Sequence, residues 1–127
     1  MSSDKKEILV IDDEPDVRTY LTTLLEDNGY AVTSAKDGQE GWQKFQQGRP
    51  DLVTLDITMP EKSGVRFYRD VKENEEFKAT PIIIITGVST DFEKFISTRK
   101  KVPAPEGYIP KPVDQNALLA KVKELIG

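Results

Sequence analysis

Short apolar runs of the kind that form buried β-strands alternate with amphipathic helical patterns along the whole chain. Apolar runs that are short and uninterrupted are typical of strands covered on both faces. A strand–helix–strand alternation places successive strands in parallel, with the connecting helices packed on the faces of the sheet. We therefore expect an α/β fold with a doubly wound parallel sheet. The predicted strands are Glu7–Ile11, Tyr30–Ala35, Leu52–Leu55, Ile82–Ile85 and Tyr108–Ile109.

Local signals predict where the intervening helices begin and end. Pro15 suits a first helical turn, because its fixed φ is helical and its missing N–H is not needed there. Asn28 and Gly29 tolerate positive φ and end that helix, and Pro103 and Pro105 end the fourth one. Helices are predicted from Pro15 to Asn28, from Asp37 to Gly48, from about Gly64, around Phe92–Ile96 and over Asp114–Ile126.

The length and composition exclude several classes of protein. A chain of 127 residues suits one domain with a single core, and we expect a flexible tail over residues 1–6 and the domain over 7–127. The absence of Cys and His excludes disulfides, thiolate nucleophiles, the usual zinc sites and histidine acid–base chemistry. A net charge of −4 argues against direct nucleic-acid binding, which needs clustered Lys and Arg. No signal peptide or membrane segment is recognisable, so we expect a cytoplasmic protein without membrane contact.

Polar side chains follow four of the five predicted strands at the point where each strand ends. Asp12 and Asp13 follow the first strand, Asp56 the third, Thr86 the fourth and Lys111 the fifth. Because the carboxyl ends of parallel strands share one edge of the sheet, we expect these side chains to lie together. This edge is the candidate site.

The residue types at this edge are those that phosphoryl transfer to a carboxylate requires. Asp56 can accept a phosphoryl group if a cation neutralises the phosphoryl oxygens. Asp12 and Asp13 offer the hard oxygen ligands that Mg²⁺ prefers. Lys111 adds a positive charge for phosphate oxygens, and Thr86 adds a hydroxyl donor. Each acid alone also fits a loop start or a capped turn; the combination favours the phosphoryl-transfer interpretation.

Four motifs, taken in order, resemble the response-regulator receiver domain of two-component signalling, and in particular the stand-alone chemotaxis regulators. The resemblance covers essentially the whole chain. The motifs are the run from Ile8 to Glu14, the run from Leu55 to Pro60 with Gly64, Ile85-Thr86-Gly87, and Gly107-Tyr108 with Lys111-Pro112.

The resemblance implies a flavodoxin-like fold with five strands in the order 2-1-3-4-5 and five helices. It implies that Asp56 accepts phosphate from the phosphohistidine of a sensor kinase or phosphotransfer protein. Asp13, Asp56 and the backbone carbonyl of Thr58 would hold Mg²⁺, and Asp12 would assist through water. The domain would promote only its own phosphorylation and dephosphorylation and would not be an enzyme acting on other substrates.

The resemblance also implies a switch. Lys111 and Thr86 would bind the phosphoryl group, and movement of Thr86 would let Tyr108 turn inward. This would change the surface of the last two helices and the last strand for a downstream protein partner, with a transient homodimer as a further possibility. The family usually has a cis bond at the position of Lys111-Pro112, which would aim the lysine inward.

Two features bear on the partner surface and on the lifetime of the phosphoryl group. The segment from Thr86 to Lys111 is a few residues longer than usual, so the fourth helix or the loop after it is expected to be reshaped. Thr58 and Val88, two positions beyond Asp56 and Thr86, carry neither an acid nor an amide that could orient an attacking water. We therefore expect slow self-dephosphorylation.

Two other functions share some of these features. A Mg²⁺-dependent phosphatase similar to the haloacid dehalogenase class would want a second acid two residues after the nucleophile, where this chain has Thr58. A receiver-like scaffold that binds partners without phosphorylation would not need the acidic pair, Thr86 and Lys111. Both alternatives fit the sequence less well than a phosphorylated receiver.

Overall fold

The computed structural model of the protein describes residues 5–57, 63–87 and 105–127. Strands and helices alternate along these ranges as predicted. The elements are β1 (Glu7–Ile11), α1 (Pro15–Asp27), β2 (Ala31–Ala35), α2 (Gly38–Gly48), β3 (Leu52–Asp56), α3 (Ser63–Lys72), β4 (Ile82–Thr86), β5 (Gly107–Pro110) and α5 (Gln115–Ile126).

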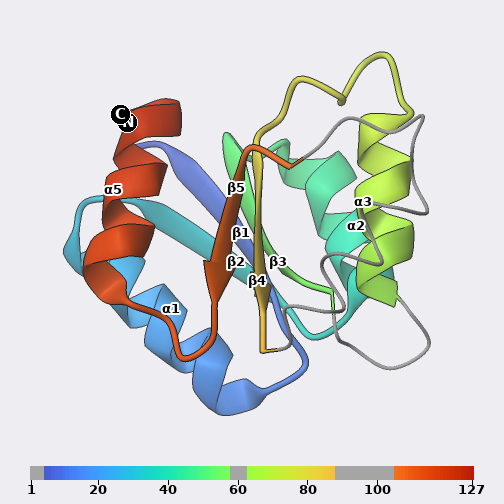
Figure 1. Ribbon diagram of the computed structural model, residues 1–127. Coiled ribbons are helices and arrows are strands. Elements are labelled where there is room, and N and C mark those ends of the chain that lie inside the picture. Colours follow the sequence, from blue (N-terminus) through green and yellow to red (C-terminus); the bar gives the residue numbers. More distant parts are fainter. Residues whose placement is uncertain (1–4, 58–62, 88–104) are drawn as a thin grey trace.

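All five strands run parallel in one sheet in the order β2-β1-β3-β4-β5 (Figure 1). The predicted order is confirmed. Ile11 of β1 pairs with Leu55 of β3, and Asp56 of β3 pairs with Ile85 of β4, so the carboxyl ends of these strands are level. Because β5 is an edge strand, Pro110 is tolerated there without a backbone N–H.

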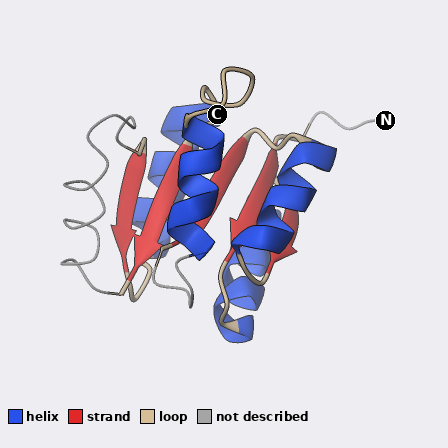
Figure 2. Ribbon diagram, turned by 90° about the vertical axis from the view of Figure 1, so that its right-hand side faces the viewer, coloured by secondary structure: helices blue, strands red, loops and turns tan. Residues whose placement is uncertain are grey.

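Helices cover both faces of the sheet, with α1 and α5 on one side and α2 and α3 on the other (Figures 1 and 2). The doubly wound architecture is therefore confirmed. The helix predicted around Phe92–Ile96 lies outside the described residues, which contain the other four. In the described ranges, no helix is both long and apolar enough to cross a membrane.

Alternate residues of the central strands pack into two separate cores. Leu9 and Leu55 face α2 and α3, where they pack with Phe45 and Phe67. Ile8 and Val10 face the opposite side, where they pack with residues of α1 and α5 that include Leu21 and Leu118. Strands β3 and β4 are buried over their whole length, as a parallel sheet covered on both faces requires. This burial fixes the strands that carry Asp56 and Thr86.

The observed boundaries differ little from the predicted ones. Pro15 begins α1 as predicted, and Gly29 has a φ of 95° beyond its end. The second strand begins at Ala31 instead of Tyr30, because the Tyr30 N–H donates to the carbonyl of Leu25 and closes the turn that ends α1. Asp114 lies just before α5 as its N-cap, and its side chain accepts hydrogen bonds from the first turn.

A partly buried ion pair, which no local sequence signal indicated, joins α3 to the amino ends of β4 and β5. The side chain of Lys72 is 1% exposed, and its Nζ lies 2.8 Å from a carboxylate oxygen of Glu106. The same Nζ donates to the carbonyls of Lys78 and Thr80. Glu106 in turn accepts a hydrogen bond from the N–H of Ile82 at 2.8 Å. This network holds the start of β5 at the end of the sheet opposite the candidate site.

Candidate functional site

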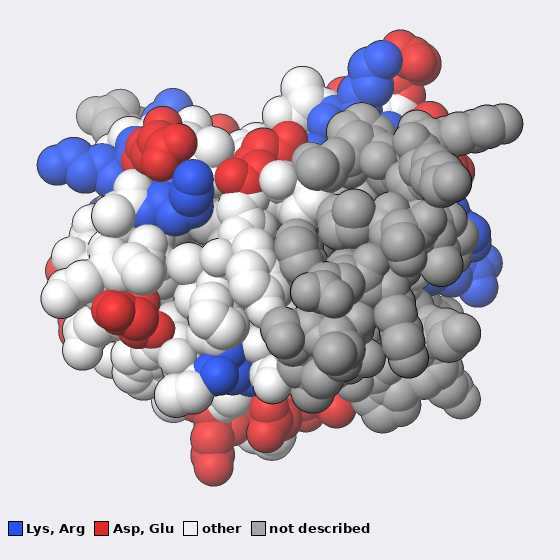
Figure 3. Space-filling model, in the orientation of Figure 1, with Lys and Arg blue, Asp and Glu red and all other residues white. Residues whose placement is uncertain are grey.

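The acidic residues predicted to converge do lie together at the carboxyl edge of the sheet. Asp12 and Asp13 follow β1, and Asp56 ends the neighbouring strand β3. Carboxylate oxygens of these three residues and of Glu14 all lie within 4.8 Å of one another. In Figure 3, acidic side chains gather at the lower end of the molecule, towards which the strand arrows of Figure 1 point.

The chain between β1 and α1 is held in a tight turn around Asp12. The Asp12 N–H donates to the carbonyl of Ala35, which continues the pairing with β2. Its Oδ1 accepts from the N–H of Glu14 at 2.9 Å, and its carbonyl accepts from Arg18 Nη1 at 2.7 Å. An aspartate that bonds the backbone two residues ahead makes such a turn on its own. The turn places the carboxylates of Asp13 and Glu14 beside that of Asp12.

Lys111 brings one positive charge into this group of acids. Its Nζ lies 2.9 Å from Glu14 Oε1, 3.1 Å from Asp12 Oδ2 and 3.4 Å from Asp56 Oδ2. Its backbone N–H donates to the carbonyl of Thr86 at 2.8 Å, and the peptide bond between Lys111 and Pro112 is cis, as the family resemblance implied. The lysine therefore lies at the same edge of the sheet as Asp56, as predicted, and also contacts it.

Burial and like charge together oppose ionisation of Asp12. Asp12 and Asp56 are 1% and 2% exposed. Burial raises the pKa of Asp12 above its ordinary value, and the Asp56 carboxylate adds to this, while the Glu14 N–H and Lys111 oppose it. Burial alone would lower the pKa of Lys111, but the hydrogen bond to Glu14 and the charges of Asp56 and Asp12 outweigh it, so this pKa is raised. The ammonium form of Lys111 is therefore maintained.

For the other residues predicted to act at the site, the structure gives only the position in the fold or no description. Thr86 is fully buried at the end of β4, next to β3 in the sheet. Tyr108 on β5 is half-buried and packs against the core beneath α2 and α3. Thr58 and Val88 lie outside the described residues. The structure thus brings together Asp12, Asp13, Asp56 and Lys111, with Thr86 on the adjacent strand.

The donor set suits a small hard dication. Carboxylate oxygens are the ligands that Mg²⁺ takes from proteins, usually one or two of them with several waters. Four carboxylates with a single ammonium leave the site net negative, and the Asp56 carboxylate adds to the burial that raises the pKa of Asp12. A bound divalent cation would offset the repulsion. The residues present therefore fit the predicted Mg²⁺.

Sequence reasoning gave no role to Glu14, although its carboxylate is the one closest to the Lys111 ammonium. Its position directly after the acidic pair, on the same strand-to-helix turn, was the available signal. The two residues are 97 positions apart, so the contact itself follows only from the folded chain.

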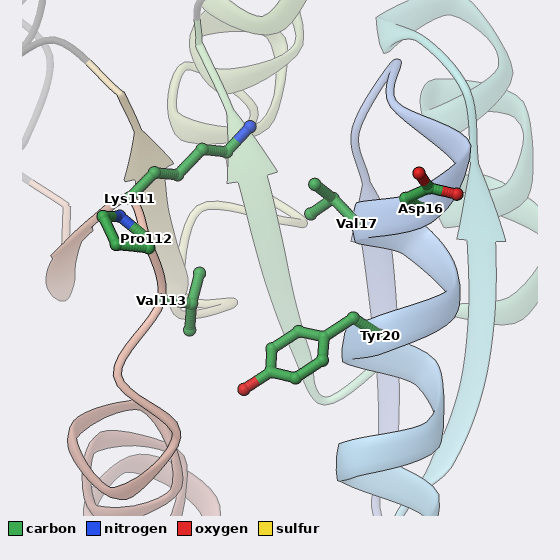
Figure 4. A pocket seen from close by; sticks show the side chains of 6 residues that line it. All are labelled: Asp16, Val17, Tyr20, Lys111, Pro112 and Val113. Carbon is green, nitrogen blue, oxygen red and sulfur yellow. The ribbon is translucent and has the colours of Figure 1, made fainter.

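A shallow apolar pocket adjoins the acidic group, between α1 and the chain that follows β5. It has a volume of about 290 Å³. In Figure 4, Val17 and Tyr20 of α1 face Pro112 and Val113 across the opening, and Asp16 lines its rim with the carboxylate turned away from Lys111. Lys111 forms part of the wall, and its side chain extends towards the end of β3. The pocket therefore gives the acidic site an apolar border on one side.

Comparisons with known proteins agree with this geometry. Residues 8–123 match the response regulator receiver domain family. Protein PilH of Pseudomonas aeruginosa is 33% identical over 119 residues, which cover 94% of this chain and 96% of PilH. Two further curated relatives are longer, and the chain covers 48% and 17% of their lengths.

Solved structures give the same result. The chemotaxis protein CheY4 of Vibrio cholerae superposes with a TM-score of 0.84 at 30% identity, covering 96% of this chain and 99% of CheY4. The response regulator TrrA of Thermotoga maritima, solved in complex with Mg²⁺ and BeF, gives a TM-score of 0.82 at 35% identity, covering 95% of this chain and 99% of TrrA. The fold, the acidic edge and the family match lead to one conclusion: this chain belongs to the response regulator receiver domain family of two-component signalling.

Proposed function

We propose that this receiver domain takes a phosphoryl group onto Asp56 in a Mg²⁺-dependent reaction. The donor would be the phosphohistidine of a sensor histidine kinase or of a phosphotransfer protein. The observation that carries the proposal is the contact of 3.4 Å between Lys111 Nζ and Asp56 Oδ2, made within a group of four carboxylates. The groups that the proposal needs as nucleophile, as cation for phosphate oxygens and as metal ligands lie close together.

In the proposed reaction, a carboxylate oxygen of Asp56 forms a bond to phosphorus as the N–P bond of the donor breaks. The electron pair of that bond stays on the leaving imidazole nitrogen. Lys111 holds its positive charge beside the incoming phosphoryl oxygens, and the Thr86 hydroxyl donates a hydrogen bond to them. Burial of Asp56 limits its hydration, which strengthens these interactions.

Asp13 and Asp56, with the backbone carbonyl of Thr58, would hold Mg²⁺, and Asp12 would assist through a water molecule. Bound Mg²⁺ supplies charge that neutralises the phosphoryl oxygens. Asp12 and Asp13 keep their positions through the turn that the Glu14 N–H closes on Asp12 Oδ1. This arrangement accounts for three acids at an edge where one nucleophile would suffice.

Phosphorylation would act as a switch of a binding surface. Thr86 would shift towards the phosphoryl group, and the half-buried Tyr108 would turn inward, which changes the surface formed by the last two helices and β5. The output would be a downstream protein partner or a transient homodimer, and the site of action would be the cytoplasm. The chain would thus work as a signalling module that modifies only itself.

The proposal is tested by incubating the protein with a small acyl phosphate, with and without Mg²⁺, and recording its intact mass. We expect a Mg²⁺-dependent gain of one phosphoryl group in the wild type and no gain in Asp56→Ala. If the wild type gains no mass at saturating Mg²⁺, the phosphorylation-independent scaffold becomes the better account. Multiple turnover of the acyl phosphate with no retained group would instead support a phosphatase.

The phosphorylated form should be long-lived. Thr58 and Val88 offer no acid or amide to orient an attacking water. We expect the phosphoryl group to persist for minutes or longer after the donor is removed, measured by the decay of the phosphorylated mass. A half-life of seconds would contradict this part of the proposal.

A further inference from the structure

The nearest carboxylate to the Lys111 ammonium is not the proposed acceptor Asp56 but Glu14. Lys111 Nζ lies 2.9 Å from Glu14 Oε1 and 3.4 Å from Asp56 Oδ2. The third carboxylate, that of Asp12, lies at 3.1 Å. The ammonium donates hydrogen bonds to Glu14 and Asp56 and forms an ion pair with Asp12, so three carboxylates already share its charge.

The three carboxylates that contact Lys111 differ in how easily each could lose that contact. The side chains of Asp12 and Asp56 are 2% exposed, whereas that of Glu14 is 60% exposed. A buried carboxylate that loses its cation is left with an uncompensated charge, which is strongly unfavourable. An exposed carboxylate that loses its cation is solvated by water, and exposed ion pairs contribute little. Glu14 is therefore the partner that Lys111 can release most easily.

A phosphoryl group on Asp56 favours the release of Lys111 from Glu14. It adds acceptor oxygens and negative charge next to an ammonium that three carboxylates already share. For Lys111 to move towards the phosphoryl group, its contact with one of these carboxylates must weaken. The exposure of Glu14 makes its contact the one that weakens.

We propose that Glu14 is a positioning residue that holds Lys111 in the unphosphorylated domain and releases it when Asp56 carries a phosphoryl group. This inference rests on the proposed function of Asp56 and extends it. Glu14 has two opposing effects in this arrangement. Its charge draws Lys111 away from the phosphoryl position, and the same charge attracts a divalent cation to the acidic group.

Glu14→Gln separates these two effects. Without the Glu14 charge, Lys111 is freer to meet the phosphoryl group, so the phosphorylation rate at saturating Mg²⁺ should rise about two- to fivefold, the size expected for one partly exposed charge pair. The concentration of Mg²⁺ needed for half-maximal rate should rise by a similar factor, because one attracting charge is lost. Damage to the fold would not raise the saturated rate.

The matched control is Asp16→Asn, which removes one negative charge from the first turn of α1. Asp16 makes no ion pair with any residue of the described ranges, and in Figure 4 it points away from Lys111. If only the loss of negative charge near the site matters, both variants should change the saturated phosphorylation rate by the same factor. If Glu14 specifically positions Lys111, only Glu14→Gln should raise this rate.

The experiment measures phosphorylation by a small acyl phosphate over a Mg²⁺ series, using the full chain of the wild type, both variants, Lys111→Met and the Glu14→Gln/Lys111→Met double variant. Binding of Mg²⁺ and beryllofluoride is followed in parallel by NMR, as a readout independent of turnover. We expect a faster saturated rate and tighter beryllofluoride binding in Glu14→Gln only, and no effect of Glu14→Gln on the saturated rate once Lys111 is replaced. Equal saturated rates of Glu14→Gln and Asp16→Asn, or a Glu14 effect on the saturated rate that survives in the double variant, would overturn the inference while leaving Asp56 as the acceptor. Failure of the wild type to gain a phosphoryl group would instead overturn the proposed function.

Discussion

Gly64, in the first turn of α3, lies directly against the backbone carbonyl oxygen of Asp56. A Cβ built on Gly64 would overlap that oxygen and would come within 3.0 Å of the Cα of Ile57. Both contacts are with backbone atoms, which cannot rotate away as a side chain would. The start of α3 is therefore packed onto the end of β3, immediately beneath the proposed acceptor. Only a residue without a side chain fits there.

Gly64→Ala should destabilise the domain by about 1–3 kcal/mol, the usual effect of an added methyl group in a closely packed place. It should also slow phosphorylation, because the backbone of Asp56 must shift to make room. Urea unfolding and intact-mass kinetics measure the two effects. Gly48→Ala is the matched control, since a Cβ there would meet nothing within 4 Å. Unchanged stability and rate in Gly64→Ala would contradict the close packing described above.

Asp12→Asn should stabilise the metal-free domain by about 0.5–2 kcal/mol, in the range of other substitutions that relieve unfavourable charge. Burial first, and then the neighbouring Asp56 carboxylate, raise the pKa of Asp12 above 3.8. The asparagine keeps an oxygen that can accept from the Glu14 N–H, so the turn should persist. Urea unfolding at neutral pH without Mg²⁺ measures the gain.

The gain from Asp12→Asn should depend on pH. Because the folded chain binds the Asp12 proton more tightly than the unfolded chain, its stability falls as pH rises through the window that begins near 3.8 and ends at the raised pKa. The difference in unfolding free energy between variant and wild type should be small below about pH 3.8 and grow through that window. A constant difference across the series would show that the charge of Asp12 is not the cause.

Asp13→Asn should remove the stabilisation that Mg²⁺ gives. Asp13 is an exposed member of the acidic group and makes no ion pair with the described residues, so its loss should alter the metal-free stability by less than about 0.5 kcal/mol. Wild type should gain about 2.7 kcal/mol when Mg²⁺ is at one hundred times its dissociation constant. Thermal unfolding with and without Mg²⁺ tests this, and an equal Mg²⁺-induced rise in both proteins would exclude Asp13 as a ligand.

Lys72→Met should destabilise the domain by roughly 2–4 kcal/mol, because it leaves Glu106 without its buried cation and the carbonyls of Lys78 and Thr80 without a donor. Adding Glu106→Gln should recover part of the loss, since the uncompensated charge is then removed. The matched control is Lys78→Met, whose own ion pair with Glu75 is exposed and should matter by less than about 1 kcal/mol. Similar losses in Lys72→Met and Lys78→Met, by urea unfolding, would show that burial of the Lys72 ammonium adds nothing.

The sequence alone was sufficient for the main features of the fold and the site. The first strand was predicted with its observed bounds, because a short apolar run between polar residues has little freedom in where it begins and ends. Asp12, Asp13, Asp56 and Lys111 could be grouped in advance, because parallel strands place all their carboxyl ends at one edge. The motif resemblance added the strand order. Apart from the strand order, these inferences use either a local pattern or a general rule of topology.

The contacts between side chains depended on the tertiary structure. Nothing in the local sequence indicates that Glu14 meets Lys111, 97 residues away, or that Lys72 is buried against Glu106, 34 residues away. Such pairs are set by how the helices pack on the sheet and by which charged groups lose water in that packing. The raised pKa of Asp12 has the same origin, since burial and the nearby Asp56 carboxylate exist only in the folded chain. The sequence therefore determined which chemical groups reach the edge of the sheet, and the tertiary structure decided which of them pair, because distance and desolvation are properties of the packed molecule.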